Sequence, residues 1–224
     1  MAARYLYTRV LALAVFLILN LIVVSAGAQE KAAPATYEVD VEASRIYIKV
    51  GAATRLGHQH GVEGNLKSGK VTFGGEGELV FDMASLTADT AEARKRVGLE
   101  KKKVSQNEAK KVTQAMRSAD VLNVEKHPTA TFRLSAIKPL DKQAAGEPGT
   151  YQIQGSLSLH GTENKLQFKG KVERADKEGQ LKATGTFTIK QTDYGMKPYA
   201  AAGGLAKVAD ELEISGELVL KESK

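Results

Sequence analysis

The chain has 224 residues, with 32 basic and 26 acidic side chains and a formal net charge of +6. This modest surplus lacks the concentrated basic character of a nucleic-acid-binding protein. The chain contains no cysteine, which excludes disulfide bridges, thiol catalysis and cysteine-ligated zinc. The composition therefore favours a globular domain stabilised by its hydrophobic core alone.

Residues 1–28 are typical of a secretory signal peptide. Arg4 and Arg9 give a positive start, and an apolar run follows from Val10 to Val24. The small residues Ala26 to Ala28 then fit the A-x-A cleavage pattern. An uncleaved membrane anchor is the alternative, but a spanning helix needs about 20 mostly apolar residues. We expect cleavage after Ala28 and a periplasmic or secreted protein with no stable membrane insertion.

Residues 29–36 are polar and contain a proline, as expected of a flexible leader. From residue 37 onward, apolar side chains recur at every second position, which is the period of a strand with one buried face. The clearest alternating segments are residues 151–160, 166–172, 181–189 and 212–220. About eight such segments predict an all-β domain over residues 37–221, folded as an eight-stranded antiparallel β-barrel.

Glycine interrupts the apolar face of four of these segments, at Gly155, Gly170, Gly185 and Gly216. Repeated inward glycines indicate bending, as at the corners of a barrel, and they leave room for a ligand. A hydrocarbon chain gains about 0.8 kcal/mol per buried CH₂ in such an interior. The predicted ligand-binding residues are Ile48, Phe73, Phe81, Phe132, Leu157, Phe168, Gly185, Phe187 and Ile214. The alternative is a barrel filled by its own side chains.

The alternation stops between about residues 88 and 120, where the chain is rich in Ala, Glu, Lys, Arg and Gln. Three apolar residues share one helical face: Val112, Ala115 and Met116. Ser105 followed by Glu108 fits a helix-capping box. The segment predicts a helical insertion that covers one end of the barrel. Its basic runs at residues 94–96 and 101–103 form either a solvated face or a cationic collar for a phosphate headgroup.

Four histidines are present: His58, His60, His127 and His160. His58 and His60 would face the same way on a strand and could bind one metal ion. A catalytic zinc site needs a third protein ligand, and the glycines on both sides indicate a turn instead. A metal-binding protein or metal-dependent enzyme that uses His58 and His60 is therefore an alternative. His127, next to Pro128, is interpreted as a loop residue.

The sequence contains no G-x-S-x-G motif, no glycine-rich phosphate loop and no H-E-x-x-H motif. We therefore expect a protein that is not an enzyme and that needs no cofactor. Its expected partner is a hydrophobic small molecule, with a homodimer as one option. A barrel that acts through its surface as a partner-binding module is the other alternative.

Four segments resemble the YceI-like family of exported bacterial polyisoprenoid-binding proteins: residues 116–123 (MRSADVLN), 127–132 (HPTATF), 155–161 (GSLSLHG) and 189–195 (IKQTDYG). The resemblance extends from Tyr37 to Leu220. It implies a lipocalin-like barrel that holds a polyisoprenoid or a similar amphiphile. The Arg-Asp pair and the histidine that many members carry before the first of these segments are replaced by Val112, Thr113 and Ala115.

Overall fold

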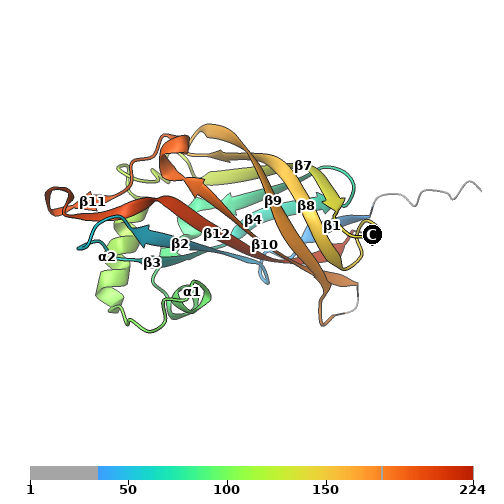
Figure 1. Ribbon diagram of the computed structural model, residues 1–224, viewed down its shortest axis with the longest axis horizontal. Helices are drawn as coiled ribbons and strands as arrows, with labels where there is room; N and C mark the ends of the chain where they lie inside the picture. Colours follow the sequence, from blue (N-terminus) through green and yellow to red (C-terminus); the bar gives the residue numbers. More distant parts are fainter. Residues whose placement is uncertain (1–34, 178, 224) are drawn as a thin grey trace, which may run out of the picture. The chain divides into compact units, whose positions relative to one another are not determined.

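The computed structural model describes residues 35–177 and 179–223 (Figure 1). The strands are β1 (Thr36–Val39), β2 (Arg45–Ala52), β3 (His60–Gly64), β4 (Leu66–Thr72), β5 (Gly77–Asp82), β6 (Thr87–Ala88), β7 (Thr129–Pro139), β8 (Gly149–Leu159), β9 (Thr162–Arg174), β10 (Gln180–Lys190), β11 (Ala200–Ala201) and β12 (Ala206–Glu222). The helices are α1 (Ala91–Arg96) and α2 (Gln106–Arg117), with short 3₁₀ turns η1 (Met83–Ser85), η2 (Gln191–Tyr194) and η3 (Ala202–Gly204).

The predicted signal peptide and most of the predicted leader lie outside the described residues, and Thr36 at the end of that leader already belongs to β1. None of the described helices is long and apolar enough to span a bilayer.

Eight antiparallel strands close into a ring in the order β1-β4-β5-β7-β8-β9-β10-β12, and β12 pairs back to β1. The long strand β12 pairs with β1 near its C-terminal end and with β2 along most of its remaining length. Beyond β2, the sheet continues through β3, which pairs with β2, and β6, which pairs with β3. The fold predicted from the alternating pattern, an eight-stranded antiparallel barrel with a helical insertion, is confirmed.

The β8–β9 hairpin shows how local sequence sets the register of the wall. His160 and Gly161 form the two-residue turn, with φ angles of 53° and 80°, and Leu159 lies opposite Thr162. Two positive φ angles are what a type I′ turn requires, and this turn matches the natural twist of the strands. The turn therefore keeps the apolar residues of both strands on the inner face.

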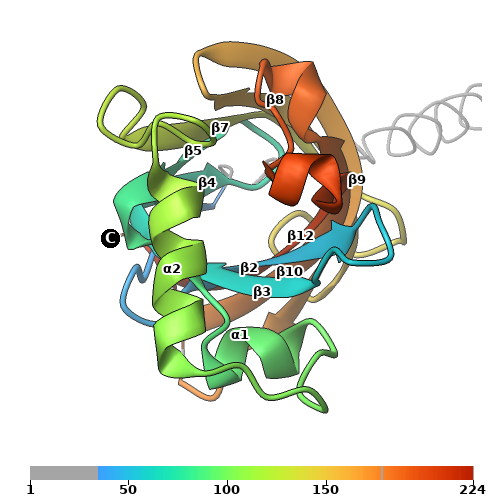
Figure 2. The same cartoon turned by 90° about the vertical axis from the view of Figure 1, so that its left-hand side faces the viewer.

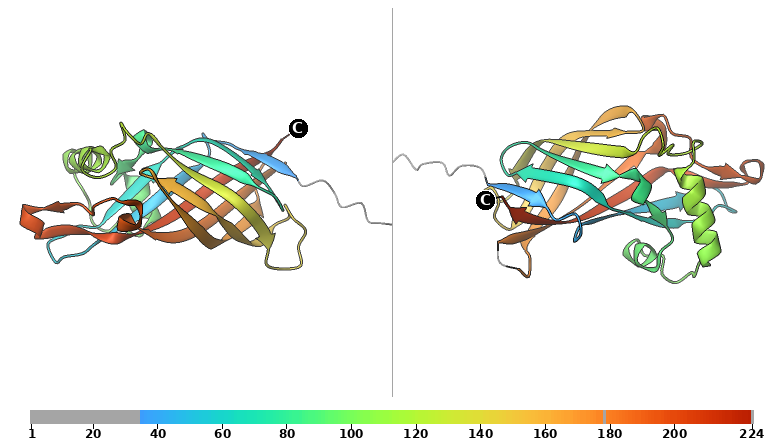
Figure 3. Two further views of the ribbon diagram at one scale, coloured as in Figure 1. Left: turned by 90° about the horizontal axis from the view of Figure 1, so that it is seen from above. Right: turned by 180° about the vertical axis from the view of Figure 1, so that it is seen from behind.

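The two helices of the insertion have different positions (Figures 2 and 3). Helix α1 packs on the outer face of β2 and β3, where Tyr47, Ala93 and Val97 form a small separate core. Helix α2 lies at one end of the barrel, and the side chain of Ser105 caps it by accepting a hydrogen bond from the Glu108 amide at 3.2 Å. This observation agrees with the capping that the sequence predicted.

Helix α2 also covers the edge of β6, which among residues 35–177 and 179–223 pairs with β3 alone. The Thr113 hydroxyl accepts a hydrogen bond from the Ala88 amide at 2.9 Å, and Arg117 Nε donates to the Leu86 carbonyl at 2.8 Å. These side chains satisfy backbone groups that a neighbouring strand would otherwise bind. Helix α2 is thereby fixed to the wall of the barrel.

One part of the wall is joined without backbone hydrogen bonds between neighbouring strands. β9 and β10 pair only from Leu181 to Gly185 of β10, although β9 stays paired with β8 and β10 with β12 beyond that point. Phe168 and Phe187 lie across this stretch, with ring centroids 4.8 Å apart. Aromatic packing therefore closes the seam between the two strands.

Candidate ligand-binding cavity

The barrel contains an apolar cavity of about 370 Å³. This volume falls in the range of about 300–1,000 Å³ that is typical of small-molecule pockets. The nine residues that the sequence predicted for the interior all line it: Ile48, Phe73, Phe81, Phe132, Leu157, Phe168, Gly185, Phe187 and Ile214. The interior is therefore not filled by its own side chains, and the role of these nine residues in binding stays a prediction.

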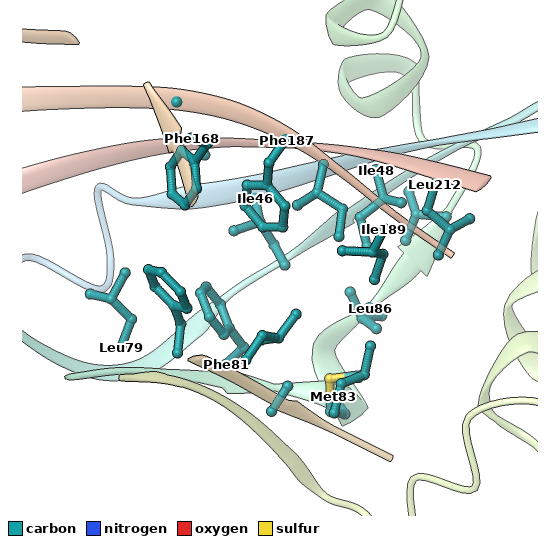
Figure 4. A pocket seen from close by; sticks show the side chains of 18 of the residues that line it. Ile46, Ile48, Leu79, Phe81, Met83, Leu86, Phe168, Phe187, Ile189 and Leu212 are labelled. Carbon is teal, nitrogen blue, oxygen red and sulfur yellow. The ribbon is translucent and has the colours of Figure 1, made fainter. Parts of the chain in front are cut away.

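The lining comes from opposite walls of the barrel (Figure 4). Phe168 and Phe187 project from β9 and β10, and Leu79 and Phe81 face them from β5. Such aromatic and aliphatic walls exclude water and favour a hydrocarbon guest over a polar one.

Three of the inward glycines form a row across neighbouring strands, because Gly185 lies opposite both Gly170 and Gly216. A Cβ atom added to Gly170 would lie 2.6 Å from the side chain of Ile153, and one added to Gly185 would lie 3.0 Å from Phe168. A Cβ added to Gly216 would meet nothing within 4 Å. Of these three glycines, therefore, Gly216 alone faces open space.

The space at the fourth glycine is also occupied, since a Cβ added to Gly155 would lie 2.8 Å from the ring of Phe132. The expectation that the inward glycines leave room for a ligand is thus wrong for Gly155 and Gly170. Large neighbouring side chains fill these places, because close packing leaves few voids in a protein interior.

A buried polar cluster adjoins one end of this apolar lining. His60 lines the cavity, and its Nδ1 lies 2.6 Å from Asp89 Oδ2. Asp89 also accepts hydrogen bonds from Arg94 Nη1 at 2.7 Å and from the Gly61 amide at 3.2 Å. The side chains of His60, Asp89 and Arg94 are 16%, 0% and 7% exposed. Buried charges are tolerated in proteins when they are paired and hydrogen-bonded in this way.

Burial by itself would raise the pKa of Asp89, but the hydrogen bonds from His60 and Arg94 outweigh it, so the pKa lies below its usual value. Asp89 is therefore a carboxylate at neutral pH. Because a carboxylate can only accept, the proton of His60 is on Nδ1. Nε2 is then the nitrogen available to the cavity.

The structure places His60 and Arg94 differently from the sequence prediction. His60 was expected in a turn, but it is the first residue of β3, where it shares the inward face with Val62. Arg94 was expected in a solvated face or a cationic collar, but it is buried against Asp89. The contact between His60 and Asp89 could not be inferred from spacing, because the two residues are 29 positions apart in the sequence.

The part of the chain that the structure describes holds no cluster of three or more His, Cys, Asp or Glu side chains suited to a metal ion. His58 and His60 therefore have no third protein ligand there. The rings of His58 and His60 are 6.4 Å apart between centroids. The ring centroids of His127 and His160 lie 4.5 Å apart, with the ring planes tilted by 47°, a contact that was not predicted from the sequence. Burial, and then the neighbouring His160, lower the pKa of His127.

Residues 37–220 match the sequence profile of the YceI-like domain family. The chain belongs to this family. Two curated relatives are the UPF0312 proteins of Azotobacter vinelandii and of Pseudomonas aeruginosa strain LESB58, each 32% identical over 126 residues. These matches cover 54% of this chain and 60% of each relative, so the chain spans less than two thirds of their length.

Two solved structures share the fold of this YceI-like chain. A polyisoprenoid-binding domain from Saccharophagus degradans, implicated in plant cell wall breakdown, has a TM-score of 0.60 at 18% identity; the match covers 85% of this chain and all of that domain. BcnA from Burkholderia cenocepacia has a TM-score of 0.52 at 18% identity, with coverage of 81% and 98%.

Proposed function

We propose that this YceI-like chain is a non-enzymatic lipid-binding protein that holds a polyisoprenoid or a similar amphiphile inside its barrel. The observation that carries the proposal is the vacant apolar cavity, with open space at Gly216. A guest that buries a long hydrocarbon chain there gains about 0.8 kcal/mol per CH₂ group. The polyisoprenoid-binding domain of the same fold from Saccharophagus degradans supports this ligand class.

The proposed place of action is the periplasm or the exterior of the cell. The support for this location is the sequence of residues 1–28, which has the order of charge, apolar run and small residues of a cleavable signal peptide. An exported carrier would protect a water-insoluble chain between membranes. Mass determination of the N-terminus of the exported protein tests the location, and a mature chain that begins at Gln29 is the expected result.

Native mass spectrometry of the purified full chain, followed by solvent extraction and lipid analysis, tests the ligand proposal. We expect a co-purifying isoprenoid-type lipid at close to one molecule per chain. A stoichiometric metal ion instead of a lipid would contradict the proposal. So would a chain that carries no lipid and that fails to bind added geranylgeraniol.

A further inference from the structure

We propose that His60, held in place by Asp89 and Arg94, forms together with Lys111 a binding site for the anionic head of the ligand, a phosphate or a carboxylate. This inference rests on the proposed lipid-binding function and assigns a polar end to the apolar cavity. The bound molecule would be an isoprenoid that ends in an oxyanion.

The first support is the position of His60 in the wall. His60 lies opposite Val50, which is paired in turn with Leu212. Leu212 is paired with Ile189 on the next strand. All four residues line the cavity, and His60 is the polar member of this row. An imidazole that replaces an apolar side chain on the inner face of a barrel is costly unless it has partners.

The second support is the way in which the cluster orients the imidazole. Asp89 binds Nδ1, and Arg94 offsets the charge of the Asp89 carboxylate. Arg94 uses its remaining donor groups on the carbonyls of Lys102 at 3.0 Å and Leu99 at 2.8 Å. Each nitrogen of the Arg94 guanidinium therefore already donates a hydrogen bond within the protein. Nε2 of His60 is the remaining ring nitrogen on the cavity side, and it donates to an oxyanion when it also carries a proton.

The backbone supports the same arrangement. Asp89 has a φ of 57°, in the left-handed region, and its amide donates to the Gly61 carbonyl at 2.6 Å. A Cβ on Gly61 would lie 2.9 Å from the Ala93 carbonyl oxygen, so a larger residue would push α1 away. The close approach of α1 to β3 thus brings Asp89 and Arg94 to His60. Such over-determined local geometry is common at functional sites.

The third support is the sign of the charges around the cavity. The described lining residues include Lys111 and Lys171 but no Asp or Glu. Lys171 is paired with Glu173 at 2.5 Å, whereas Lys111 forms no ion pair within residues 35–177 and 179–223. Lys111 lies on α2 beside Val112, Ala115 and Met116, which also line the cavity. A lysine ammonium and an imidazole that carries a proton on both nitrogens are donors to oxyanions.

The test compares three probes that share one hydrocarbon chain: farnesyl phosphate, farnesoic acid and farnesol. Their affinities for the full-length chain are measured by calorimetric titration at pH 6.5. We expect the wild-type chain to bind at least one of the two acids about tenfold more tightly than the alcohol, the usual scale of one or two charge-assisted hydrogen bonds. The acid that binds more tightly shows whether the head of the ligand is a phosphate or a carboxylate.

The His60→Gln variant keeps a polar side chain but removes the imidazole ring. It should lose most of the preference for the acid while the affinity for farnesol stays unchanged. The matched control is His58→Gln, which should keep the preference, because His58 does not line the cavity. If His60→Gln proves unstable, the Lys111→Gln variant is tested instead, because Lys111 is an exposed residue at the rim of the cavity. It should show a smaller loss of the same preference.

The outcomes separate this inference from the proposed function. Equal affinity of the wild-type chain for all three probes would overturn the headgroup site and leave lipid binding in place. A preference for an acid that survives in His60→Gln, or in Lys111→Gln where His60→Gln does not fold, would also overturn it. Failure of the wild-type chain to bind any probe, with no lipid on the purified protein, would refute the proposed function itself.

Discussion

Gly185 of β10 lies directly opposite Gly216 of β12, yet only Gly216 faces open space. We expect Gly216→Phe to fill the cavity and to remove most of the bound lipid. The fold should tolerate the change, because an aromatic residue is favoured in a strand over glycine. Lipid content per chain, measured by mass spectrometry, checks this prediction.

The matched control is Thr188→Phe, at an exposed position on β10 between Phe187 and Ile189. It adds the same ring to the outer face and should leave the lipid content unchanged. Equal lipid content in Gly216→Phe and the wild-type chain, with both variants folded, would show that the ligand does not occupy the space at Gly216. Gly185→Phe is a harsher test, because the new side chain must displace Phe168.

The seam between β9 and β10 gives a second prediction. Phe187 contacts Phe168 where the two strands are not paired. Phe187→Ala should therefore speed ligand release by about tenfold. This is the effect of losing roughly 1.4 kcal/mol of packing free energy. Dissociation of a fluorescent polyene lipid, followed by stopped flow, measures the rate. Phe132→Ala is the control, since β7 is hydrogen-bonded to β5 and β8 on both sides. Similar release rates for the two variants would exclude a special role for the seam.

Asp89 gives a third prediction. Asp89→Asn removes the charge that pairs with both His60 and Arg94, and we expect a loss of about 3 kcal/mol in the free energy of unfolding at pH 7. Urea denaturation followed by circular dichroism measures this loss. Asp40→Asn breaks a surface pair with Lys221 and should cost far less, because exposed ion pairs are weak.

The pH dependence of this loss follows from the direction of the Asp89 pKa shift. The folded-state pKa is lower than the unfolded value of about 3.9. The carboxylate therefore stabilises the fold above that pH, and its contribution is lost as the pH falls through the folded-state pKa. The stability difference between the wild type and Asp89→Asn should shrink in acid. A difference that stays constant from pH 7 to pH 3 would contradict this account.

Much of the barrel could be predicted because its signal is local. Alternation along single strands was enough to predict that Ile48, Leu157 and Ile214 point to a shared interior. The helix cap at Ser105 could also be predicted, because its partner Glu108 is only three residues away. These features depend on residues that are close together in the chain, so they can be predicted from the sequence alone.

The polar cluster could not be predicted, because it depends on contacts between distant segments. His60 contacts Asp89 only when α1 packs on β3, and no periodic pattern in the sequence indicates that contact. The same holds for the glycines, since the sequence does not show that Phe132 fills the space at Gly155 whereas nothing fills it at Gly216. Vacant volume is a property of the packed interior and not of any single strand.

The chain contains no tryptophan, so Phe187→Trp would place one indole on the cavity wall as a reporter of its contents. Titration of the delipidated variant with geranylgeraniol should give a saturable change in indole emission, with an end point near one ligand per chain. Leu205→Trp, at a position that is 63% exposed, should show no saturable change. A flat titration for a folded Phe187→Trp chain would contradict the claim that the barrel interior is the lipid site.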